Sequence, residues 1–78
     1  MTDDTTLSLF TIYDHPSDYP AHFVVREYQV ARDGCVSPVE PPQLYPTLQA
    51  ARQVQFDAWR MCLRRQAGDD PVIIESWL

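Results

Sequence analysis

The positions of proline and glycine constrain the fold of this chain more than any other feature of its sequence. The chain contains seven prolines and two glycines. Proline removes a backbone donor, fixes φ and pushes the preceding residue toward extended backbone, so regular elements seldom continue through it. Four segments lie between these breaks, and we expect each to form one regular element: residues 7–13, 22–30, 48–65 and 72–78.

Three of the four segments show the two-residue alternation of β-strands. Apolar side chains stand on both sides of the alternation in residues 7–13, which predicts a central strand. Residues 22–30 follow as a second strand, and Gly34 suits the positive φ of the turn that ends it. We expect residues 72–78 to pair with the first strand, which gives the spatial order second, first, last.

The fourth segment has the periodicity of a helix. Thr47 is a suitable N-cap, residues 48–65 contain neither glycine nor proline, and Gly68 ends the segment. Residues 35–46 contain four prolines, and we expect them to form an irregular connection along the surface. The sequence therefore predicts an α+β fold of order β-β-α-β, with a three-stranded antiparallel sheet and one long helix packed on one face.

Length and charge restrict the possible functions. A chain of 78 residues is expected to form a single domain over 1–78, with residues 1–6 frayed. Such a short chain buries only roughly 60% of its unfolded surface, which leaves little stability to hold a strained catalytic cleft. Its net charge is −5, and an acidic chain repels phosphate. We therefore expect a protein that binds another protein, without catalytic residues, cofactor or direct contact with nucleic acid.

The sequence carries no sign of export or of membrane insertion. Its first residues lack the basic and apolar regions of a signal peptide, and no segment is apolar enough to cross a membrane. We expect a cytoplasmic protein of a bacterial host cell, in which Cys35 and Cys62 are reduced thiols. All six basic residues are arginine, a bias typical of high-GC bacterial and phage genomes.

One polar cluster and one cysteine are the candidates for chemistry. Two aspartates and two histidines around the first turn could ligate a metal, but their spacing matches no established pattern. Turn-forming acids beside exposed histidines are the simpler interpretation, and we expect no metal site. A cysteine with a histidine would suggest a nucleophile and its base, but nothing near this cysteine in the sequence supports that. The residues concerned are Asp14, His15, Asp18, His22 and Cys35.

The aspartates in the turns form the first candidate surface for a partner. If the turns meet at one edge of the sheet, their carboxylates would imitate the phosphates of nucleic acid and occupy a basic groove on another protein. The alternative is that these aspartates only keep the chain soluble. The candidate residues are Asp14, Asp18, Asp33, Asp69 and Asp70.

The outer side of the expected helix forms the second candidate surface. Its apolar arc is wider than a three-stranded sheet can cover, so part of it would remain for a partner or a second copy. Val39, Leu44 and Tyr45 of the proline-rich segment could instead cover this arc, and the arginines could be a solvated face with one salt bridge. The candidate residues are Phe56, Trp59, Arg60, Leu63 and Arg64.

Two segments of the chain carry a resemblance to a family. The opening Thr11–Pro20, TIYDHPSDYP, which runs on to Arg26, and the close Asp69–Leu78, DDPVIIESWL, resemble those of a family of small uncharacterised proteins of proteobacteria and their prophages. The family has no established activity, so the resemblance assigns no functional residue. Its members more often have a shorter, proline-broken helical segment, and residues 56–65 depart from that pattern. By size, charge and origin alone, the chain is also similar to anti-CRISPR proteins, which block host defence.

Three functional hypotheses follow. The first is a non-enzymatic inhibitor that binds a bacterial nucleic-acid-handling defence complex, such as a CRISPR surveillance complex, through its acidic turns and its apolar helix side. The alternative is a prophage or housekeeping accessory protein without an inhibitory role, which self-associates through Phe56, Trp59 and Leu63. The third is a small metal or thiol enzyme that uses the histidines or the cysteine named above. The chain is accordingly expected to be a monomer or a homodimer.

Overall fold

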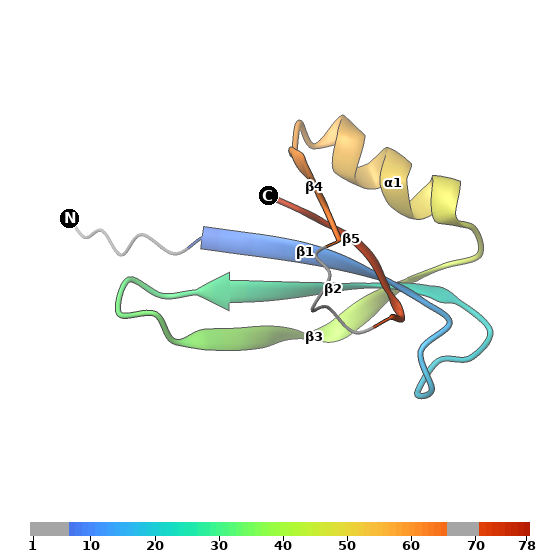
Figure 1. The fold of residues 1–78 in the computed structure, drawn as a ribbon, viewed down its shortest axis with the longest axis horizontal. Helices are drawn as coiled ribbons and strands as arrows, with labels where there is room; N and C mark the ends of the chain where they lie inside the picture. The colour runs from blue at the N-terminus through green and yellow to red at the C-terminus, as the bar shows by residue number, and fades with distance from the viewer. Residues whose placement is uncertain (1–6, 66–70) are drawn as a thin grey trace.

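The computed structural model describes residues 7–65 and 71–78, which form one sheet of five strands with a helix packed on it (Figure 1). All neighbouring strands are antiparallel, and their order across the sheet is β3-β2-β1-β5-β4. The elements are β1 (Leu7–Asp14), β2 (Phe23–Val30), β3 (Val36–Tyr45), α1 (Leu48–Asp57), β4 (Cys62–Arg64) and β5 (Ile73–Trp77).

The expected pairing of the first, second and last strands is confirmed. β1 lies between β2 and β5, and Ile12 stands opposite Val25 in one neighbour and Glu75 in the other. The consecutive residues Thr11 and Ile12 are both buried, although their side chains point to opposite faces. The central strand is therefore covered on both faces at this point, in agreement with the apolar groups on both sides of its alternation.

The expectation of an irregular connection over residues 35–46 is wrong. Residues Val36–Tyr45 form β3, which pairs with β2 along one edge of the sheet, so the sheet is larger than the three strands predicted. An edge strand bonds to a neighbour on one side only, and proline is tolerated there for that reason. The pairing shifts between Val25 and Glu27, opposite the stretch that contains Pro41 and Pro42, and the Glu40–Pro41 peptide bond is cis.

The expectation of a helix that continues to about Arg65 is also wrong. Thr47 caps α1 as predicted, since its hydroxyl oxygen accepts from the Ala50 backbone N–H at 3.1 Å. The helix ends at Asp57, however, and the chain turns into the short strand β4. Backbone hydrogen bonds of 2.8 and 2.9 Å join Met61 to Leu78 and continue the pairing of β4 with β5. Pairing between strands thus overrides the helical periodicity of this segment.

The core lies between α1 and the face of the sheet that carries Ile12. Ala51, the most buried residue of α1, packs against this face, and its small side chain lets the helix approach the strands closely. The core cluster consists of Ile12, Val25, Ala51 and Trp77, against which Phe10, Tyr45, Leu48 and Ile74 pack. The outer side of α1 and the turn that follows it remain outside this core.

Candidate functional site

A group of large apolar side chains is exposed where α1 ends. Trp59 is 95% exposed, Phe56 is 70% exposed and Met61 is 68% exposed. These three residues, which we call the helix-end surface, lie on the last turn of α1 and on the link to β4 (Figure 1). Large aromatic groups that project together into solvent are uncommon on a small protein and mark a surface that contacts something else.

The backbone at the helix end forms a Schellman motif, a helix-ending pair of hydrogen bonds. The Arg60 N–H donates to the Gln55 carbonyl at 3.2 Å, and the Trp59 N–H donates to the Phe56 carbonyl at 3.0 Å. The motif requires left-handed backbone at its penultimate residue, which is usually glycine. Here that residue is Trp59, with φ of 61°. A side chain at this φ costs about 1 kcal/mol, so the position of Trp59 is maintained against a local preference.

Arg60 holds this turn against the sheet. Its guanidinium lies over the Phe10 ring, 3.6 Å from the ring centroid, and donates to the Gln55 side-chain oxygen at 3.1 Å. Gln55 itself is buried and donates from its amide to the Ala51 carbonyl at 3.3 Å. Because the turn is fixed by these contacts and by the Schellman bonds, the aromatic rings project from a well-defined backbone.

Two cavities flank Phe56. The first, of about 490 Å³, runs along α1 and reaches Trp77, and the second, of about 310 Å³, lies at the helix end. Phe56 lines both, so the two cavities are neighbours that share this residue. The first is lined by Leu48, Gln49, Arg52, Gln53, Phe56 and Trp77, and the second by Phe56, Asp57, Trp59 and Arg60.

A buried carboxylate network lies beside the first cavity. The Arg52 guanidinium donates to both oxygens of Glu75 at 2.9 Å, and the Trp77 indole N–H donates to Glu75 Oε2 at 2.9 Å. Burial raises the pKa of the Glu75 carboxyl, but the hydrogen bonds from Arg52 and Trp77 outweigh it, so the pKa lies below its ordinary value. Burial and the charge of Glu75 raise the pKa of the Cys62 thiol, which favours the unreactive form. This network lies beside the cavity, and sequence inspection missed it because Arg52 on α1 is 23 residues away from Glu75 on β5.

The structure separates the residues predicted for the helix side. Phe56 and Trp59 are exposed together, and the segment that could have covered them instead forms β3 at the far edge of the sheet. Leu63 and Arg64 belong to β4 and not to the helix, so they do not continue a stripe with Phe56. Arg60 belongs to the site, but its guanidinium is directed toward Phe10.

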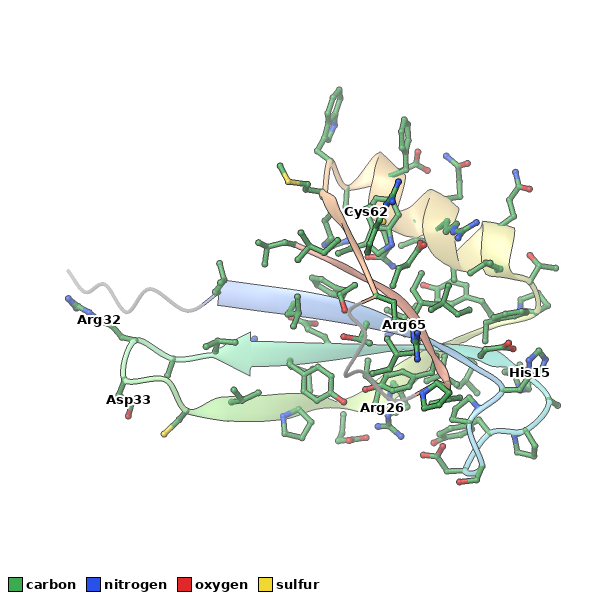
Figure 2. The ribbon with its side chains drawn as sticks, in the orientation of Figure 1. His15, Arg26, Arg32, Asp33, Cys62 and Arg65 are labelled. Atoms are coloured by element: carbon green, nitrogen blue, oxygen red, sulfur yellow. The ribbon has the colours of Figure 1, made fainter. Side chains whose placement is uncertain are left out.

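The described acidic turns lie at two ends of the molecule. Asp14 is the last residue of β1 and pairs with His15. Asp18 lies in the turn between β1 and β2 and pairs with Arg26. Asp33 lies in the β2–β3 turn at the other end of β2, and Figure 2 shows it far from His15. Hydrogen bonds from the Cys35 backbone N–H and thiol lower the pKa of Asp33. The other two predicted acids, Asp69 and Asp70, lie outside the described residues.

The candidates for chemistry are not gathered into a site. His15 contacts Asp14 and packs edge-on against the Phe23 ring, with centroids 4.6 Å apart. Within residues 7–65 and 71–78, no group of three or more potential metal ligands occurs. Cys35 and Cys62 are both free thiols. Nor does any helix among the described residues have the length and hydropathy needed to cross a membrane.

Comparisons of the chain with protein-family models, with curated proteins and with solved structures find no match. The resemblance of its opening and closing segments to a proteobacterial and prophage family therefore stays an expectation from the sequence. The candidate site stands on geometry alone: two exposed rings at and just after the end of α1, a turn held by hydrogen bonds, and two cavities that share Phe56.

Proposed function

We propose that this protein acts by binding another protein through the helix-end surface, and that it catalyses no reaction. The observation that carries the proposal is the almost complete exposure of Trp59 on a turn that is fixed by hydrogen bonds. Tryptophan is the side chain most enriched among residues that dominate binding energy at protein interfaces. A rigid turn reduces the ordering cost of binding, which favours affinity.

We propose further that the partner is a bacterial nucleic-acid-handling defence complex, for example a CRISPR surveillance complex, which this protein inhibits. Support comes from the net charge of −5, which would attract a basic nucleic-acid groove, and from the resemblance to small proteins of prophages. Since the described turn aspartates lie at two ends of the molecule, their part would be to accelerate the encounter, whereas the helix-end surface would anchor the complex.

The test compares tagged wild-type protein with Trp59→Gly in pull-downs from cells that express CRISPR surveillance complexes, followed by binding assays with the purified complex. We expect wild-type protein to retain the complex, DNA to compete, and target-DNA binding by the complex to fall. Loss of a central interface tryptophan should weaken capture by about 30-fold. Val36→Ala, which trims an exposed apolar residue on β3, is the matched control and should bind normally.

Two outcomes would contradict the proposal. Equal capture by wild-type protein and Trp59→Gly would remove the helix-end surface from binding. Capture that leaves DNA binding by the complex unchanged would remove the inhibitory role.

Self-association is the second candidate function, because the same exposed rings could meet across a two-fold axis. Sedimentation velocity distinguishes it from the first. A dimer that dissociates in Phe56→Ala and Trp59→Gly would favour self-association, whereas a monomer at millimolar concentration would exclude it. Each copy carries a charge of −5, so a dimer should also become stronger as salt screens the repulsion.

A further inference from the structure

We infer that the cavity at the helix end receives the cationic side chain of a lysine or arginine from the partner. The inference rests on the proposed function and names the chemistry of the group that the helix-end surface recognises. The cavity of about 310 Å³ is lined by Phe56, Asp57, Trp59 and Arg60, which are two aromatic rings, one carboxylate and one arginine. Aromatic faces attract cations through their quadrupole, and a carboxylate adds a direct charge partner.

The end of α1 provides the first electrostatic reason. The C-terminal end of a helix carries a partial negative charge, and cations are stabilised there. The last turn of α1 contains no basic residue that would neutralise this partial charge. Asp57 adds a full negative charge at the same place, and its side chain accepts a hydrogen bond from the neutral amide of Gln53 at 2.9 Å. None of the ion pairs between described residues involves Asp57.

Arg60 does not take the place of the incoming cation. Its guanidinium is directed to the Phe10 ring and to the Gln55 side chain, which belong to the sheet and to the inner side of α1. These two contacts of Arg60 show how an aromatic face and one neutral acceptor together hold a guanidinium in this fold. Phe56 and Trp59 line the cavity together with Asp57, so aromatic rings and a carboxylate are available to a cation there.

The neighbouring cavity has a different character. The Arg52 guanidinium lines this cavity and is bound to both oxygens of Glu75, so the positive charge of Arg52 is already paired. That cavity therefore suits an apolar side chain. The partner segment would place an apolar side chain there and a basic side chain in the cavity at the helix end, both beside Phe56. A second copy of this chain is a poorer occupant, since two copies repel through their charges of −5.

The test uses the two tryptophans of the chain as reporters. In a ¹⁵N-labelled sample, the Trp59 indole signal reports on the cavity at the helix end, and the Trp77 indole, which is bonded to Glu75 and lines the neighbouring cavity, reports on that cavity instead. The probes are N-acetyl-lysine N-methylamide and N-acetyl-norleucine N-methylamide, which differ in the charged amine. We expect the lysine probe to shift Trp59 and not Trp77, and to bind about two to five times more tightly than the norleucine probe.

Asp57→Asn is the matched variant, because an asparagine oxygen can still accept from Gln53 while the charge is lost. The preference for lysine should shrink in this variant and in 1 M salt. Equal binding of the two probes would overturn the inference, and so would the absence of any shift at Trp59.

Different results would contradict the docking function and the cation site. If Trp59→Gly abolishes capture of the complex while neither probe moves the Trp59 signal, the protein-binding function stands and the cation site is wrong. If the lysine probe binds while Trp59→Gly captures the complex as wild-type protein does, the cation site stands and the proposed docking function is wrong.

Discussion

The turn after α1 and the strand β5 each place one of the chain's two tryptophans, and they place them in opposite environments. Trp77 is 8% exposed, belongs to the core and donates its indole N–H to the buried carboxylate of Glu75. Trp59 lies on left-handed backbone and is surrounded by solvent. The two tryptophans show that an apolar residue type does not decide its own burial: Trp77 is placed by its strand and by the carboxylate that accepts its indole hydrogen bond, and Trp59 by a helix-ending motif.

The largest loss of stability should follow from substitution of the buried tryptophan. Trp77→Ala should destabilise the fold by about 3–5 kcal/mol, because it removes a core indole and leaves a cavity. A domain of this size has a stability of about 5 kcal/mol, so much of the variant should be unfolded. Urea denaturation followed by circular dichroism measures the change. Trp59→Ala removes the same atoms from the exposed side and should stay within about 0.5 kcal/mol of wild type; equal losses in the two variants would contradict the comparison.

The next largest loss of stability concerns Glu75, whose carboxylate accepts the hydrogen bond of the Trp77 indole. Glu75→Gln should destabilise the fold by about 1–3 kcal/mol, since Arg52 loses its charged partner and the indole loses a strong acceptor. The loss of stability should lie near the lower end of this range, because about half of the Arg52 side chain faces solvent and can be hydrated. Glu40→Gln, on an exposed carboxylate that contacts Arg26 at 3.4 Å, is the control and should change the free energy of unfolding little.

The pH dependence of stability should carry the signature of the same carboxylate. The pKa of Glu75 in the fold lies below its ordinary value of 4.5, so the unfolded chain binds the proton more readily. Its contribution to stability is therefore complete above about pH 4.5 and is lost as the pH falls through the lower pKa of the folded state. Urea midpoints measured from pH 7 to pH 3 should fall less steeply in Glu75→Gln; identical slopes would exclude Glu75 as a source.

The smallest effect on stability should have the opposite sign. Trp59→Gly relieves the left-handed backbone at that position, and the free energy of unfolding should rise by up to about 1 kcal/mol. Trp59→Ala keeps a Cβ atom at the same φ and should not gain this increment. Thermal unfolding of the pair isolates the backbone contribution. A loss of stability in Trp59→Gly would mean that the indole packs in solution.

The sequence was sufficient for the elements whose pattern is local. Alternation located β1, β2 and β5, and Thr47 marked the start of α1. β3 was missed because its prolines are compatible with a strand only at an edge, and edge position is a property of the whole sheet. β4 was missed because three residues are too few for a periodicity, and the helix-ending motif before it has Trp59 where glycine is usual.

The candidate site was predicted in part. Phe56 and Trp59 were recognised as more apolar surface than a small sheet can cover, and both are exposed. The two cavities that share Phe56 could not be predicted, since they depend on where the chain turns after Asp57 and on where Trp77 lies relative to α1. The pairing of Arg52 with Glu75 joins residues 23 positions apart and has no local signal.

The prolines of β3 have a consequence for how such molecules can stack. Three of the ten residues of this edge lack a backbone N–H, so an incoming strand would find an interrupted ladder there. A fibre grows only if each added molecule leaves an unpaired strand edge to which the next molecule can bind. Because the β3 margin is interrupted, edge-to-edge addition is disfavoured there, and addition through the opposite margin alone would close after two molecules.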